Sequence, residues 1–299
     1  MPRTGTRIVR LRSIVASAAG AGAIIAMAPA ALSAPAADRQ VAARATAWLT
    51  QQDVAAMPAG QQADIITSRR LTGASPAALR PALKTLGRTA AAYATTPGAM
   101  AKVVIAQRAA GMSGALGGRN YLERLQRSTR EGRFGRTAFD QCLSMVALRV
   151  AGRPIPPAAV TALTGSRSDS GWSFSLTSSQ PPDVDSTSMA VVALRAARVP
   201  ASDPAIRDAL TWLESQRANA GWTLFSGGAP STDSTALVAR AQVAAGVSAD
   251  VGLTFIRGLA EPSGAIANTR AAPESRLLAT IASVPPLTGI SLANGFRAG

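Results

Sequence analysis

Small apolar residues, chiefly alanine, recur along most of this chain in helix-length runs that glycine and proline residues separate. Alternating runs of β-branched residues, which would predict strands, are absent. The runs come in pairs: the first contains an aromatic–aliphatic step, a glycine-containing turn follows, and the second is rich in alanine and opens near an acidic residue. The aromatic–aliphatic steps are Trp48-Leu49, Tyr121-Leu122, Trp212-Leu213 and Phe255-Ile256. This pattern predicts an all-α protein built from helical hairpins.

Two of these hairpins have nearly the same sequence. Gly171-Trp172 precedes the segment Asp183-Val184-Asp185-Ser186-Thr187, and Gly221-Trp222 precedes Asp233-Ser234-Thr235. The two Asp-Ser-Thr triplets start 48 residues apart. Repetition at such a period is typical of stacked helical pairs, each of which buries its apolar face against its neighbours. The second helices of four pairs open near Asp140, Asp185, Asp233 and Glu274, and two further pairs lie upstream. We therefore expect about six hairpins in one domain, residues 37–299. The repeats are clearest in residues 121–246.

The first 36 residues have the pattern of a secretory signal peptide. Four arginines precede an apolar run of small residues, and Ala34-Pro35-Ala36 provides an A-x-A cleavage site. A retained anchor is the alternative, but a spanning helix needs about 20 strongly apolar residues, and this run is short and rich in glycine and alanine. No other stretch is long and apolar enough to span. We therefore expect a secreted or cell-surface protein that does not span the membrane after cleavage.

The composition of the chain excludes several kinds of catalytic and metal-binding site. The chain has no histidine, which excludes Ser-His-Asp and Cys-His catalysis and the common zinc sites, and its single cysteine, Cys142, lies in an apolar run. We therefore predict no metal and no cofactor, and a buried, unreactive Cys142. The formal net charge is +15, but the basic residues are spread out and are not interleaved with aromatic residues. A solvated surface is favoured over nucleic-acid binding, and attachment to anionic wall polymers stays a third functional possibility.

The acidic and aromatic residues of the repeats have a structural and a functional interpretation. Asp183, Asp185 and Asp233 precede apolar helical runs, where a short polar side chain caps a helix, and capping is favoured over an acid–base pair at a cavity mouth. Trp172 and Trp222 are candidates for stacking on a ligand, with packing between helices favoured. Asp140 and Asp233 complete the candidate ligand-binding set. Arginines near the expected C-terminal ends of second helices, namely Arg108, Arg149 and Arg195, are explained by favourable interaction with those ends without an anionic ligand.

The repeats resemble those of a known superfamily. Trp212-Leu213-Glu214-Ser215-Gln216 followed by Gly221-Trp222 resembles the QW repeat of squalene/terpene cyclases and protein prenyltransferases. The segment Asp183–Thr187 is similar to the Asp-x-Asp-Asp-Thr motif of class II cyclases. The resemblance implies an α/α toroid, in which inner helices line a central cavity and their starts face its mouth. It also implies that Asp185 is the acid that protonates an alkene or epoxide, with Asp183 as its neighbour.

The chain departs from the chemistry of that superfamily. Ser186 replaces the third acid of the motif, aromatic residues that would stabilise cations make up only 4% of the chain, and a second barrel has no room. Prenyltransferases hold zinc with a histidine that this chain lacks, and Cys142 does not lie in the thioester context of complement proteins. The first hypothesis is therefore a non-catalytic module that binds an apolar or bulky ligand or a cell-surface partner. The cobalamin carriers of the superfamily are similar in being exported, single-barrel and non-catalytic, but they bind their ligand with a second small domain for which this chain has no obvious room. The alternative is a terpene cyclase-like enzyme that acts on an isoprenoid with Asp185 as general acid. A dry, aromatic-lined pocket over Asp185 would favour the enzyme.

Overall fold

The computed structural model describes residues 34–225, 227–271 and 276–296, and these contain α-helices and short 3-10 helices without strands. The predicted signal peptide lies almost wholly outside the described residues, and so does Glu274. No helix in the described ranges has the length and apolar character needed to cross a membrane. The helices are α1 (Ala36–Gln51), α2 (Ala59–Leu71), α3 (Pro76–Tyr93), α4 (Pro97–Ala109), α5 (Tyr121–Arg127), α6 (Ala138–Val150), α7 (Pro157–Thr164), α8 (Val184–Ala196), α9 (Pro204–Ser215), α10 (Thr232–Ala245), α11 (Asp250–Gly258) and α12 (Arg276–Thr288), with 3-10 helices η1 (Val54–Ala56) and η2 (Leu292–Asn294).

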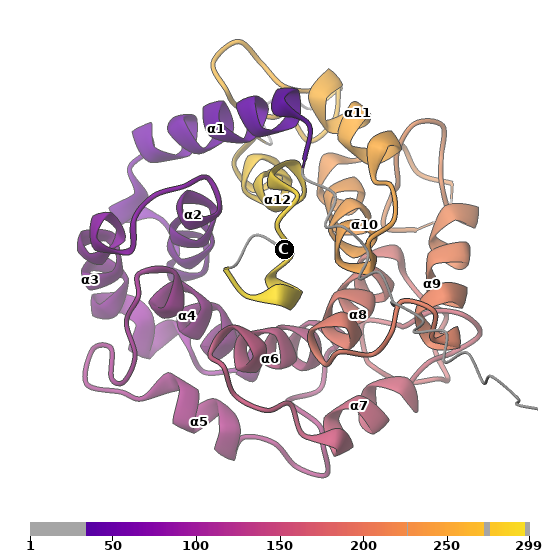
Figure 1. Ribbon diagram of the computed structural model, residues 1–299, viewed down its shortest axis with the longest axis horizontal. Helices are drawn as coiled ribbons and strands as arrows, with labels where there is room; N and C mark the ends of the chain where they lie inside the picture. Colours follow the sequence, from indigo (N-terminus) through magenta and orange to yellow (C-terminus); the bar gives the residue numbers. More distant parts are fainter. Residues whose placement is uncertain (1–33, 226, 272–275, 297–299) are drawn as a thin grey trace, which may run out of the picture. The chain divides into compact units, whose positions relative to one another are not determined.

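The helices alternate between an outer and an inner ring (Figure 1). Each even-numbered helix from α2 to α12 packs on the next even-numbered helix, and α12 packs on α2, so that the inner ring is closed. The odd-numbered helices lie outside and pack on the inner helices beside them. This arrangement is an α/α toroid of six helical hairpins, which confirms the predicted fold class and the predicted number of hairpins.

The two rings differ in how much of each helix is buried. The outer helix α9 buries only Ile206, Ala209 and Leu213, a narrow stripe at helical spacing, and exposes its charged residues. The inner helix α8 buries residues on every side, including three that carry hydroxyl groups, Ser186, Thr187 and Ser188. A helix that is covered all round must have small side chains if its neighbours are to approach closely. The alanine-rich second run of each pair in the sequence is therefore the inner helix.

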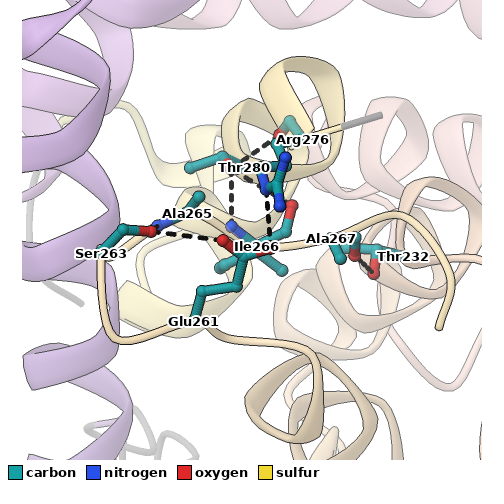
Figure 2. Close-up of polar contacts among 8 residues, drawn as sticks. All are labelled: Thr232, Glu261, Ser263, Ala265, Ile266, Ala267, Arg276 and Thr280. Atoms are coloured by element: carbon teal, nitrogen blue, oxygen red, sulfur yellow. Dashed lines mark hydrogen bonds and ion pairs between the residues drawn. The ribbon is translucent and has the colours of Figure 1, made fainter. Parts of the chain in front are cut away.

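A side chain on each of four inner helices binds the turn that precedes it. Thr187 Oγ1 accepts a hydrogen bond from Trp172 N at 3.0 Å, and Thr235 Oγ1 accepts one from Trp222 N at 2.9 Å. Figure 2 shows the same contact in the last hairpin, where Thr280 Oγ1 accepts from the backbone N–H of Ile266 at 2.9 Å. In α6 a glutamine side chain takes this place and accepts from Phe134 N. We call Gln141, Thr187, Thr235 and Thr280 the turn-binding residues; they fix the position of each turn relative to its inner helix.

The predicted cap at Asp183 is confirmed at the start of α8, whereas the predicted caps at Asp185 and Asp233 are wrong. Asp183 is the N-cap of α8, where its Oδ1 accepts a hydrogen bond from Ser186 N at 2.7 Å. The N-cap of α10 is Ser231, so the prediction that Asp233 caps this helix is wrong. Asp185 and Asp233 both occupy the second residue of their helices. Because Asp183 and Ser231 already cap these helices, the Asp185 and Asp233 side chains are not needed as caps.

The chain after α12 turns back into the middle of the ring (Figure 1). There η2 packs on α6 and α8, and Arg149 Nε donates a hydrogen bond to Ala293 O at 3.1 Å. At the end of α8, Arg195 Nε donates to Ala244 O at 3.0 Å. These two arginines therefore bind backbone carbonyls near helix ends, which agrees with their structural interpretation. The segment after α12, whose place the sequence leaves open, lies inside the toroid.

Candidate functional site

The centre of the inner ring holds a cavity of about 280 Å³. All six inner helices contribute to its lining, and so does Leu292 of η2. Most of the lining is apolar, and Phe139 is its aromatic member among the described residues. The lining residues are Asp64, Thr67, Ser68, Lys102, Ile105, Phe139, Leu143, Asp185, Met189, Asp233, Leu237, Arg240, Leu278, Ile281, Ala282, Pro285 and Leu292.

The hairpin repeat determines which side chains reach this cavity. Two positions before each turn-binding residue, the inner helices place a side chain in the lining near their N-terminal ends; these residues are Phe139, Asp185, Asp233 and Leu278. One helical turn further on, the same faces supply Leu143, Met189, Leu237 and Ala282. Residues four apart lie on one helix face, so the lining forms successive layers. The first layer holds two carboxyl groups, which come from the adjacent helices α8 and α10. The second-layer residues of α6, α8, α10 and α12 are apolar.

The Asp185 carboxyl group is the most perturbed acid of the cavity. Burial raises its pKa to about 6, and the charges of Asp183 and Asp233 act in the same direction, whereas a hydrogen bond with the Ser234 side chain opposes them. Its Oδ1 atom is buried and has no hydrogen-bond partner. This carboxyl group therefore changes its protonation near pH 6, and one of its oxygen atoms accepts no hydrogen bond from the protein.

The two neighbouring acids have different surroundings. Burial raises the pKa of Asp183, although its capping hydrogen bond from the backbone of Ser186 lowers it. Burial also raises the pKa of Asp233, whose backbone N–H donates to Asn268 Oδ1 at 3.1 Å. Like charges disfavour simultaneous ionisation of acids that lie close together. The charges of Asp183 and Asp233 both act on Asp185, so the three carboxyl groups form one acidic cluster near the N-terminal ends of α8 and α10, and Asp185 and Asp233 are the two that line the cavity.

Basic residues line the deeper part of the cavity. Lys102 Nζ lies 2.7 Å from Asp64 Oδ2 in an ion pair between α4 and α2. Burial lowers the pKa of Lys102, but the charge and hydrogen bond of Asp64 together with Tyr93 outweigh burial and leave the pKa raised. Arg240 extends from α10, and burial lowers its pKa, opposed by the charge of Asp64. Within the described part of the chain, the Arg240 guanidinium makes no hydrogen bond and no ion pair.

Asp183 is not a lining residue, and three other candidate residues from the sequence also lie outside the lining. Trp172 and Trp222 are completely buried, and their Nε1 atoms donate hydrogen bonds to the carbonyls of Leu163 and Leu213 at 2.7 and 2.6 Å. They pack between helices, in agreement with the structural interpretation. Asp140 Oδ1 accepts a hydrogen bond from the backbone N–H of Gly98 at 2.8 Å and so joins the starts of α6 and α4. The structure thus brings Asp183, Asp185 and Asp233 together and separates them from Trp172, Trp222 and Asp140.

The remaining sequence candidates concern the cysteine and metal binding. Cys142 is completely buried, and burial raises the pKa of its thiol, as expected for a small apolar residue of the core. Among the described residues, no three acidic, histidine or cysteine side chains are grouped in a way that would hold a metal ion.

Asp64, Lys102 and Arg240 are site residues that the sequence analysis missed. Asp64 and Lys102 lie in the two upstream hairpins, which lack the Asp-Ser-Thr triplet. Arg240 follows Asp233 by seven residues, a spacing that returns to the same helix face. Applying that spacing to the repeat would have placed Arg240 in the lining. The pairing of Asp64 with Lys102 depends on how α2 and α4 pack, which the sequence pattern does not specify.

Comparison with known proteins confirms the fold and gives no family. No protein-family model matches the chain, and no curated protein matches it. Among solved structures, it is similar to the type II terpene cyclase MstE from Scytonema, with a TM-score of 0.60, 13% identity, and coverage of 84% of this chain and 97% of that one. It is also similar to haptocorrin in complex with Cbi (TM-score 0.54, 10% identity, 88% and 70% covered) and to a glycosidase (TM-score 0.54, 14% identity, 84% and 95% covered). At these identities the likeness shows a shared α/α-toroid fold, as the sequence resemblance implied, and leaves the function to the site itself.

Proposed function

We propose that the central cavity binds a small, largely apolar molecule and releases it unchanged. The observation that carries this proposal is the lining: leucine, isoleucine, methionine and proline side chains surround the cavity, with charged groups at a few positions. Its volume of about 280 Å³ lies just below the usual range for ligand pockets, about 300–1,000 Å³. Such a site favours a compact ligand that buries most of its surface.

Two further observations support binding at this site. Leu278, which belongs to the first layer of the lining, is 55% exposed, and the exposed Phe174 packs its ring against Phe139 with centroids 6.2 Å apart. Apolar side chains therefore extend from the cavity to the surface at the N-terminal ends of the inner helices. Haptocorrin, which is similar in fold, was solved in complex with a ligand, so this fold is compatible with binding.

Native mass spectrometry tests this proposal directly. The protein purified from its own host should carry a small molecule that is lost on denaturation. The variant Met189→Trp fills the cavity from the second layer and should carry none, whereas Val247→Trp, on an exposed residue outside the lining, should bind as the wild type does. Unchanged binding by Met189→Trp, or the absence of both a bound molecule and any affinity for apolar probes in the wild type, would count against the proposal.

A second candidate function is a terpene cyclase-like proton transfer by Asp185. It is favoured by the Asp185 carboxyl group, which retains its proton up to a pH of about 6 and faces an apolar cavity with one unoccupied oxygen. Protonation of an alkene also requires groups that stabilise the resulting cation, and Phe139 is the aromatic residue that the described lining supplies. Ser186 replaces the third acid of the cyclase motif. Binding without catalysis is therefore the better supported function.

Incubation with an acyclic isoprenoid alcohol, geraniol, separates the two functions. Under the binding proposal, the wild type and Asp185→Asn both bind geraniol and neither converts it. Formation of a cyclic product by the wild type, lost in Asp185→Asn while binding persists, would establish the enzyme instead.

A further inference from the structure

The cavity has an uneven distribution of charge along its length. Asp185 and Asp233 lie in the first layer, near the N-terminal ends of α8 and α10. Arg240 lies seven residues after Asp233 on α10, which corresponds to about 10 Å along a helix axis. Acidic groups thus occupy the exposed end, and an arginine occupies the deeper end.

The deeper end has one positive charge in excess. Lys102 and Asp64 form an ion pair and neutralise each other. Arg240 is the remaining basic residue of the lining, and in the described ranges no hydrogen-bond acceptor or carboxylate pairs with it. Arg240 is half-buried, a guanidinium group stays charged in proteins, and partial removal of a charge from water without a partner is destabilising. For the same reason, burial lowers the pKa of Arg240, because it disfavours the charged form.

A ligand with one negative charge would satisfy this group. The planar guanidinium matches the geometry of a carboxylate and binds it through two parallel hydrogen bonds. The apolar second layer of the lining lies between Arg240 and the exposed end of the cavity, and it provides an apolar surface for the rest of the ligand. Its members here are Leu143, Met189 and Leu237. The acidic cluster at the opposite end repels an anion and therefore opposes the reverse orientation.

We propose that the cavity binds an apolar molecule with a single terminal carboxylate, whose carboxylate pairs with Arg240 while its apolar chain points toward Asp185 and the exposed end. This inference rests on the proposed binding function and adds to it the chemical class of the ligand and its orientation.

Isothermal titration calorimetry at pH 7.5 with decanoate and decan-1-ol tests the inference, since the two probes share a ten-carbon chain and differ in charge. The wild type should bind decanoate at least ten-fold more tightly than decan-1-ol. Arg240→Met, which keeps an apolar side chain of similar length, should lose this preference while its affinity for decan-1-ol stays within about two-fold. Arg240→Lys should retain part of the preference, because it keeps the charge and loses the paired hydrogen bonds.

Arg198→Met is the matched control, because Arg198 is exposed and does not line the central cavity. It should bind both probes as the wild type does. Equal affinity of the wild type for the two probes would overturn the inference and leave the binding function standing. An equal loss of both affinities in Arg240→Met would overturn it as well. Failure of the wild type to bind either probe would contradict the binding function itself.

Discussion

The Asp185 carboxyl group should make the folded protein less stable as the pH rises. Its pKa increases from the ordinary value of 3.8 to about 6 on folding, mainly because the group is buried. Well below pH 3.8 the group is protonated in both the folded and unfolded states, so its burial has no electrostatic cost. Between pH 4 and 6 the unfolded state releases the proton more readily than the folded state does. The free energy of unfolding therefore falls across this window and stays lower above it.

The magnitude follows from the change in pKa. One pKa unit corresponds to about 1.4 kcal/mol, so the penalty approaches about 3 kcal/mol above pH 6. The positive end of the α8 dipole favours a charged Asp185 by about 0.3–1 kcal/mol, which reduces the expected penalty to about 2–3 kcal/mol. Asp185→Asn removes the charge and keeps the shape of the side chain. At pH 7.5 it should therefore raise the free energy of unfolding by this amount, or the Tm by about 5–10 °C.

Urea unfolding at pH 4.0 and 7.5 measures this effect. Asp185→Asn should be more stable than the wild type at pH 7.5 and equal to it within about 0.5 kcal/mol at pH 4.0. Asp250→Asn replaces an exposed carboxyl group in the first turn of α11 and should change stability by less than about 0.5 kcal/mol at both pH values. A variant at position 185 that is no more stable than the wild type at pH 7.5, or whose effect is the same at both pH values, would refute the reasoning.

Three further substitutions test the packing of the hairpins by urea unfolding. Thr187→Val leaves the buried N–H of Trp172 without an acceptor and should cost about 1–3 kcal/mol, whereas Thr161→Val, on an exposed face of α7, should cost less than about 0.5 kcal/mol. Trp172→Phe removes the donor to a carbonyl of α7 and should cost at least about 1–3 kcal/mol; a neutral result would show that this hydrogen bond is unimportant. Gly132→Ala should cost clearly more than Gly152→Ala: both glycines have positive φ, but a Cβ would lie 2.1 Å from a backbone oxygen at Gly132 and meet nothing within 4 Å at Gly152, so equal costs would contradict the predicted clash.

The all-α class and the number of hairpins could be predicted because each hairpin repeats the same local pattern. The Gly-Trp turn and the threonine that binds it lie within one repeat, 15 residues apart for Trp172 and Thr187, so their relation is visible in the sequence. The N-caps were harder to predict. Asp183 and Ser231 occupy equivalent positions four residues before the turn-binding threonine, but the shared Asp-Ser-Thr triplet drew attention to Asp233 instead.

The cavity depends on contacts between repeats, and these are less visible in the sequence. The ion pair of Lys102 with Asp64 joins two helices whose repeats lack the Asp-Ser-Thr triplet. The place of η2 depends on the closed ring that surrounds it, since Leu292 reaches the cavity only when all six inner helices are in position. The depth of Arg240 below Asp233 follows from helix geometry alone. The residue lies outside the Asp-Ser-Thr triplet, so the repeat motif alone does not indicate it.

Ring closure has a consequence for how this protein folds. In an open solenoid each repeat contacts only its neighbours, folding can propagate from any point, and a terminal repeat can be lost without disturbing the others. Here α1 packs on α12, and Arg257 forms an ion pair with Asp38 across 219 residues of chain. Contacts at such long sequence separation require a costly loop closure and slow folding. We therefore expect the hairpins to unfold together as one cooperative unit, and deletion of a single hairpin to abolish the folded state rather than shorten it.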